Sequence, residues 1–188
     1  MSRAGASVLL TLAAFAIAGT AADAKVFVSM EEALKLAFPA AKVERKTMFL
    51  TTAQQREAQR LSGDEAPPSA LVTYYVAMQD GRELGTAYFD THVVRTMPET
   101  IMVVVDALGR SSRIEVLSFQ EPEEYLPRPR WYEQFRDKAL NDELSMKRGI
   151  RPVAGATLTA RATIEATRRV LALHTVIHGA DASKRASP

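Results

Sequence analysis

The stretch Leu71-Val72-Thr73-Tyr74-Tyr75-Val76-Ala77-Met78, followed by Asp80-Gly81 and by a second run over Leu84–Thr96, decides the fold of this chain. Both runs are rich in β-branched and aromatic residues, which are typical of β-strands. Asp-Gly between two such runs favours a two-residue turn, because both residues accept positive φ angles. We therefore predict an antiparallel hairpin.

A second hairpin is predicted directly after the first. Thr100–Val105 and Ser112–Phe119 are strand-like runs on either side of a turn over Asp106–Gly109. Strands joined by such short turns pair antiparallel. Since helical patterns lie before and after them, we expect an α+β fold, with a twisted antiparallel sheet of four or more strands in meander order and flanking helices.

The region before the hairpins has helical signals. Ser29 and Glu32 form a capping-box pattern, which predicts a helix that ends at Phe38 before a proline. A second helix is predicted over Thr51–Leu61, with a strand over Val43–Leu50 between the two helices.

The extreme N-terminus has the pattern of a secretory signal peptide. Arg3 precedes the apolar run Val8–Ala18, and Ala22-Asp23-Ala24 resembles a small-residue cleavage site. The apolar run is shorter than the ~20 residues that a membrane-spanning helix needs. We therefore expect cleavage near Ala24 and a periplasmic or secreted protein.

Composition narrows the function further. The chain has no cysteine, which excludes disulfides and clusters bound by cysteine, and a net charge of only +2, which does not indicate nucleic-acid binding. The expected organisation is a signal peptide (1–24), an N-terminal helical portion and linker (25–69), a main domain (70–178) and a disordered tail (179–188).

A long helix is predicted near the C-terminus. The residues expected on its buried face are three or four apart: Ala160, Ile164, Thr167, Leu171 and His174. The charged residues expected on its solvent side are Arg161, Glu165, Arg168 and Arg169. Thr159 is the expected N-cap, and Gly179 is expected to end the helix.

The segment Gly155-Ala156-Thr157-Leu158-Thr159-Ala160 opens this helix and indicates a phosphate site. Gly155 and Ala156 leave little side-chain bulk, and a helix N-terminus offers unpaired N–H groups and a positive dipole end. We expect the N–H groups around Leu158 to Ala160 to bind the anion.

This segment, with the Arg-Arg-Val-Leu-Ala-Leu that ends at Leu173, resembles the FMN-binding domain shared by the C and G subunits of the bacterial Nqr and Rnf redox pumps. The resemblance also extends upstream and covers roughly Gly85 to Leu173, including the strand pair around Asp106–Gly109 and the segments Glu121–Tyr125 and Trp131–Phe135. In covalent members, a periplasmic flavin transferase attaches FMN by a phosphoester bond to the threonine after Gly-Ala, which here is Thr157. The cofactor-binding residues that the resemblance implies are Thr157, Gly155, Ala156, Leu158, Thr159, Arg151, Glu121 and Trp131.

The form of attachment stays open. Covalent members carry an acidic residue six positions before the acceptor and Ser or Thr three before it, whereas this chain has Arg151 and Ala154. A guanidinium pairs well with phosphate oxygens, so Arg151 suits noncovalent FMN.

The resemblance implies an exported flavoprotein that passes electrons between membrane or periplasmic redox partners, with the flavin rather than protein groups carrying the chemistry. Two alternatives remain. One is a cofactor-free exported binding or assembly module of the same fold. The other is a flavin-dependent reductase.

Three further patterns each have two interpretations. Asp90 and His92 fall on one face of a strand and form either a general-base pair or part of a polar sheet face. His174 and His178 have metal-like spacing, but a helix C-terminus favours histidine in any case. The aromatic residues of Trp131–Phe135 either flank a flavin or dock a helix on the core.

Overall fold

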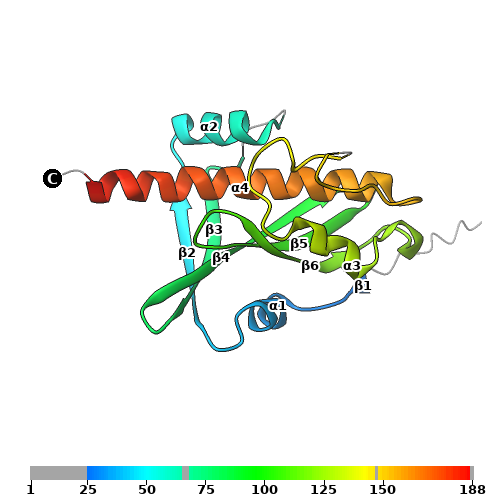
Figure 1. Cartoon of the computed structure of the whole chain (residues 1–188), viewed down its shortest axis with the longest axis horizontal. Coiled ribbons are helices and arrows are strands. Elements are labelled where there is room, and N and C mark those ends of the chain that lie inside the picture. Colours follow the sequence, from blue (N-terminus) through cyan, green and yellow to red (C-terminus); the bar gives the residue numbers. More distant parts are fainter. Residues whose placement is uncertain (1–24, 65–67, 147, 187–188) are drawn as a thin grey trace, which may run out of the picture.

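A computed structural model of the chain describes residues 25–64, 68–146 and 148–186. The predicted signal peptide, 1–24, lies outside the described residues. The fold is a six-stranded antiparallel sheet with helices, which confirms the expected α+β class (Figure 1). The strands are β1 (Lys25–Val26), β2 (Lys42–Phe49), β3 (Leu71–Gln79), β4 (Arg82–Val93), β5 (Pro98–Val105) and β6 (Ser111–Phe119).

The strand order is β1-β6-β5-β4-β3-β2, so β2 to β6 form the expected meander and β1 adds to its far edge. Asp80 and Gly81 connect β3 and β4 with φ angles of 51° and 76°, as the predicted two-residue turn requires. The expected N-terminal portion, 25–69, thus contributes two strands to the same sheet.

The predicted second strand is too long at its C-terminal end. β4 ends at Val93 rather than Thr96, and residues 94–97 form the turn into β5, closed by a bond from the Val94 N–H to the Met97 carbonyl (3.1 Å). The carboxylate of Glu121 accepts the backbone N–H groups of this turn, which removes them from the strand ladder.

Helices cover both faces of the sheet. The helix α1 (Met30–Ala37) lies on one face, and α4 (Thr157–Ala186) crosses the other, with α2 (Thr52–Ser62) packed on the outer side of α4 (Figure 1). Capping boxes begin α1 and α2, at Ser29 as predicted and at Thr51. No helix among residues 25–64, 68–146 and 148–186 is long and apolar enough to cross a membrane.

Two hydrophobic cores follow from the period-two alternation of the strands. Ile101, Val103 and Val105 point to the core beneath α4, whereas Met102 and Val104 point to the core beneath α1. Three short helical segments follow β6: η1 (Glu123–Tyr125), α3 (Pro129–Tyr132) and η2 (Glu133–Phe135). Of these, α3 and η2 contribute side chains to the first core. Phe135, at the end of η2, is fully buried there.

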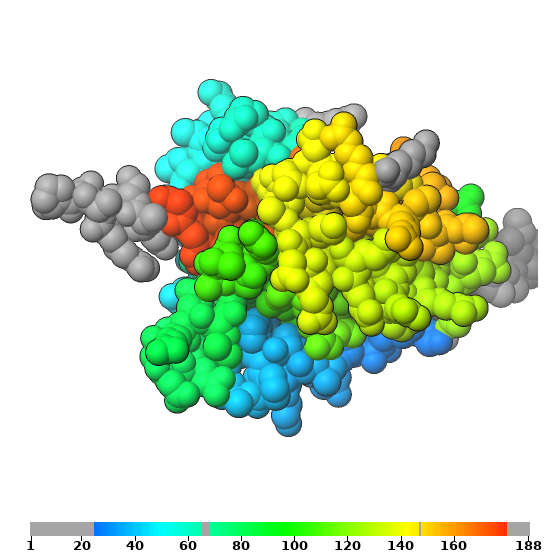
Figure 2. All heavy atoms as spheres, in the orientation of Figure 1, coloured from blue at the N-terminus to red at the C-terminus, as the bar shows by residue number. Residues whose placement is uncertain are grey.

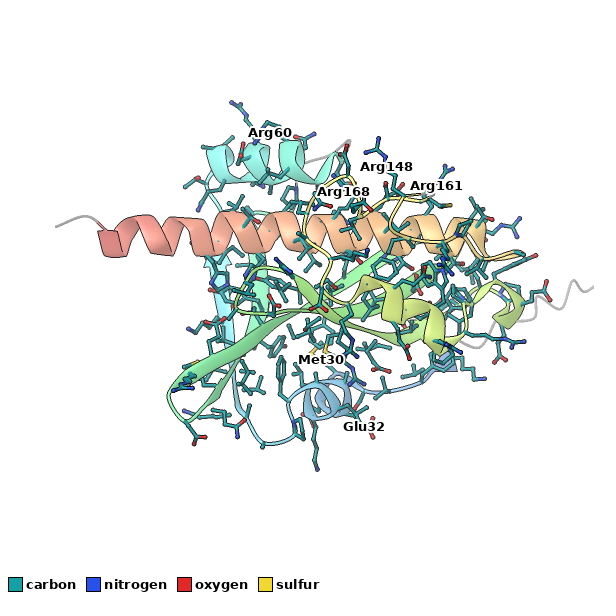
Figure 3. All side chains as sticks on the ribbon, viewed as in Figure 1. Met30, Glu32, Arg60, Arg148, Arg161 and Arg168 are labelled. Carbon is teal, nitrogen blue, oxygen red and sulfur yellow. The ribbon has the colours of Figure 1, made fainter. Side chains whose placement is uncertain are left out.

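The α4 helix confirms the predicted buried face, since Ala160, Ile164, Thr167, Leu171 and His174 are all buried. Of the residues predicted on its charged side, Arg161 and Glu165 are exposed as expected. The rest of that side is less exposed, because α2 packs against α4. Arg168 and Arg169 are half-buried: Arg168 donates to the Ser62 carbonyl and Arg169 to Asp90. Arg148, Arg161 and Arg168 lie on the α2 side of α4 (Figure 3).

The expected helix end at Gly179 is wrong. Gly179 does not adopt the left-handed φ of a glycine cap, and α4 continues through it to Ala186. The expected tail is therefore helical as far as residue 186.

Candidate functional site

The start of α4 is set by Gly155, whose φ of 82° favours glycine. A side chain at this position would have no atom within 4 Å, so the space beside the glycine is open. The helix begins at Thr157, three residues earlier than a Thr159 N-cap requires, since that cap would make residue 160 the first helical residue. Thr159 lies inside the first turn, where its Oγ1 donates to the Tyr125 carbonyl (2.6 Å), so the predicted capping role is wrong.

The first turn of α4 leaves N–H groups available. The Ala160 N–H donates to the Ala156 carbonyl at 2.9 Å. The N–H groups of Thr157, Leu158 and Thr159 have no acceptor within the described part of the chain. The donors expected over residues 158–160 therefore lie one residue earlier, over 157–159.

A hollow of about 160 Å³ lies at this helix start, lined by Arg95 and Tyr125 together with residues 155–159. The guanidinium of Arg95 stacks over the Tyr125 ring, 4.7 Å from its centroid. Arg95 is exposed and forms no ion pair with any described residue. A permanent positive charge thus stands beside the unpaired N–H groups.

Three segments far apart in sequence meet here. The turn 94–97, the η1 segment and the start of α4 lie at one end of the molecule (Figures 1 and 2). Their junction is fixed by two polar anchors, the bond from Thr159 to the Tyr125 carbonyl and the carboxylate of Glu121.

Glu121 organises the wall that carries Arg95. Its Oε1 accepts the N–H groups of Arg95 (3.2 Å), Thr96 (2.7 Å) and Met97 (2.9 Å). Burial alone would raise the pKa of Glu121, but these hydrogen bonds outweigh it and hold the pKa below its usual value. Glu121 therefore acts as an ionised anchor of the turn.

Arg151 and Trp131 line a different hollow, together with Arg130 and Lys138. The Trp131 Nε1 donates to the Arg151 carbonyl (2.7 Å), and the Arg151 N–H donates to Gln134 (2.9 Å). Trp131, Tyr132 and Phe135 are buried in the core beneath α4, which confirms the interpretation that this segment docks on the core.

The predicted site does not include Arg95, because the strand predicted over Leu84–Thr96 extends past this residue. Pro98, at the start of the next strand, was the available signal for a turn at this point. No local signal identifies Glu121 as the anchor of that turn, since 24 to 26 residues separate the bonded groups.

The structure brings Asp90 and His92 together, with 2.9 Å between Asp90 Oδ1 and His92 Nδ1. The other ring nitrogen of His92 lies 3.0 Å from Glu99, so both nitrogens are occupied by carboxylates. Among the described side chains, no hydroxyl group is bonded to His92. The structure therefore offers no nucleophile that His92 would activate as a general base.

His174 and His178 stack on each other, with ring centroids 4.1 Å apart. Burial and the neighbouring His178 lower the pKa of His174 to about 4, and the ring meets the Tyr88 hydroxyl at 3.1 Å. Within residues 25–64, 68–146 and 148–186, no group of three or more potential metal ligands is present.

Comparison of the chain with protein-family models, with curated proteins and with solved structures found no match in any of the three. The site must therefore be judged by its own chemistry. Unpaired N–H groups at a helix start, open space at Gly155 and an exposed guanidinium form a donor set suited to a phosphate or another small anion.

Proposed function

We propose that this protein is an exported FMN-binding flavoprotein that acts in electron transfer, and that the hollow at the start of α4 binds the phosphate end of FMN. One observation carries this proposal: residues 157–159, whose N–H groups are unpaired, and Arg95 line the same hollow. The choice of FMN among phosphate ligands rests on the resemblance of the Gly155–Thr159 segment to FMN-binding domains.

The residues at the hollow fit a phosphate. Gly155 keeps space open at the backbone, and Ala156 adds only a methyl group. Arg95 supplies charge, and the dipole of the 30-residue α4 adds to it. Ligand pockets generally have about 300–1,000 Å³. A hollow of about 160 Å³ is smaller, so it suits the phosphate end alone.

The flavin ring, when bound, supplies the electron-transfer chemistry, and the protein groups bind and orient it. Thr157 is exposed, lines the hollow, and is the residue to which a periplasmic flavin transferase would attach FMN. Arg95 would bind the same phosphate noncovalently, because its guanidinium is permanently charged and lines the hollow. Export rests on the signal pattern of residues 1–24.

The test is to produce the full chain with its signal peptide in a bacterial host that expresses a periplasmic flavin transferase. We expect a yellow periplasmic protein with flavin absorbance. In the covalent form, the intact mass exceeds that of the polypeptide by one FMN less one water, and Thr157→Ala abolishes this addition. In the noncovalent form, denaturation releases free FMN.

The control is Thr175→Ala, which changes a threonine in the same helix far from the hollow. This variant should keep its flavin. A correctly folded protein with neither an FMN adduct nor releasable FMN would refute the proposal and favour a cofactor-free module.

A further inference from the structure

Four charged side chains form a row beneath α4. Arg169 of α4 donates to both oxygens of Asp90 (3.2 and 2.9 Å). Asp90 meets one ring nitrogen of His92 at 2.9 Å, and Glu99 meets the other at 3.0 Å. The row thus joins α4 to β4 and β5.

The row is largely shielded from water. The exposed fractions of the side chains are 9% for His92, 16% for Asp90 and 0% for Glu99. In the described part of the chain, His92 is the hydrogen-bond partner of the Glu99 carboxylate, whose Oε1 has no partner. Loss of the proton that His92 shares with Glu99 would leave the buried Glu99 carboxylate without a cationic partner, whereas Asp90 keeps Arg169.

His92 keeps its proton well above neutral pH. Burial alone would lower its pKa, but the hydrogen bonds and charges of Asp90 and Glu99 outweigh burial and raise the pKa to about 9. The charged or titratable groups near the row are Glu165 on α4, Asp64 after α2, and Tyr132 on α3. Burial raises the pKa of Tyr132 far above its usual value, so this group stays neutral in the same range.

The row lies directly below the turn that carries Arg95. His92 and Glu99 are cross-strand partners of β4 and β5, the two strands that the turn 94–97 connects. The bond between their side chains therefore holds the two strands together three residues before Arg95. Glu121 holds the same turn from the other side.

We propose that His92 is a positioning residue, which as an imidazolium between Asp90 and Glu99 holds Arg95 at the hollow at the start of α4, and that loss of its proton weakens anion binding there. The identity of the ligand as FMN rests on the proposed function. The claim that protonated His92 holds the turn 94–97 does not depend on that function. Arg95 contacts the anion, and His92 acts through the strand ends.

The experiment measures the dissociation constant of FMN between pH 7 and 9.5, using protein made without a flavin transferase. Wild-type affinity should fall about tenfold, the magnitude of one charged hydrogen bond, with a midpoint near pH 9. His92→Gln should bind weakly at pH 7 with no such midpoint. Glu99→Gln should move the midpoint to lower pH, because His92 loses one of its two negative partners.

Tyr132→Phe is the control variant, since it removes the other titratable group beside Glu99, and it should keep the wild-type profile. Arg95→Gln should bind FMN weakly at every pH. A His92→Gln protein with wild-type affinity and profile would overturn the proposal.

Amide exchange of ligand-free protein at pH 7 separates this proposal from the proposed function. The N–H groups of residues 95–97 should exchange about tenfold faster in His92→Gln than in wild type, with the fold confirmed by circular dichroism. If neither the wild type nor any variant binds FMN, the FMN function alone is refuted. If the N–H groups of residues 95–97 exchange at the same rate in His92→Gln and in wild type, the role of His92 is refuted.

Discussion

At the scale of single residues, Glu121 has the largest influence on the shape of the candidate site. One carboxylate oxygen serves three backbone donors of the turn that presents Arg95. An ionised acceptor makes stronger hydrogen bonds than a neutral one. The position of Arg95 therefore depends on a side chain that does not line the hollow.

Glu121→Ala should lower the free energy of unfolding by about 2–3 kcal/mol, because three N–H groups lose their acceptor. The stabilisation is present above the unfolded pKa of glutamate and is lost as the pH falls through the lowered folded value. Urea denaturation at pH 7 and at pH 3 measures both effects.

Glu124→Ala is the matched control, as Glu124 is exposed and accepts no hydrogen bond from a described residue. Its effect should stay within about 0.5 kcal/mol. Equal destabilisation by the two substitutions would contradict the anchoring role of Glu121.

Local sequence could predict part of the site. Gly155 and Ala156 predicted a helix start with space for an anion, since small residues and helix ends act locally. Pro98 is a local signal for the turn that carries Arg95, but the position of Arg95 at the hollow depends on Glu121, which is distant in sequence. Arg151 was expected near the phosphate, whereas it lines another hollow.

At the scale of elements, the sequence best predicted the features that interactions between neighbouring residues determine, such as helix caps and tight turns. The capping box at Ser29 and the Asp80-Gly81 turn formed as expected. The α4 helix differed where tertiary packing decided: α2 covers Arg168 on the side that spacing assigned to solvent, and Arg169 donates to Asp90 of the sheet. The spacing of apolar residues identifies the face of a helix that packs on the core, but it does not show that another helix packs on a different face.

Two glycines provide a test of strand and helix packing. A Cβ at Gly85 of β4 would lie 2.7 Å from the Val105 carbonyl oxygen, which is backbone and cannot rotate away. Gly85→Ala should therefore destabilise the protein by roughly 1–3 kcal/mol, the range for overpacking. Thermal or urea unfolding measures the change.

Gly179→Ala is the control, because a Cβ there would meet nothing within 4 Å and the residue lies inside α4. This substitution should be neutral or stabilise by up to about 1 kcal/mol, as alanine favours helix more than glycine does. Loss of stability in Gly179→Ala with none in Gly85→Ala would contradict the packing described for both elements.

At the scale of the whole molecule, the candidate site lies at one end of the sheet, where three distant segments of the chain meet. The β4–β5 turn, η1 and the start of α4 meet because α4 crosses the sheet face on which Tyr88, Asp90 and His92 lie. The α+β class could be predicted from strand and helix patterns alone. The meeting of three distant segments could not, because it depends on how α4 crosses the sheet.

One exposed edge of this sheet, the strand β2, is protected by charge. The edge strand β2 is largely exposed and presents Lys42, Glu44, Arg45 and Lys46. Charged residues on an edge strand oppose pairing with another chain. The candidate site lies away from this edge, between the β4–β5 turn and α4.

The central claim is that the hollow at the start of α4 binds the phosphate of FMN. The most direct test compares FMN with riboflavin, which lacks the phosphate, by isothermal titration of protein made without a transferase. We expect FMN to bind about 100-fold more tightly, which corresponds to two or more charged hydrogen bonds. Arg95→Gln should weaken FMN binding and leave riboflavin binding unchanged. Equal affinity for the two compounds would contradict the claim.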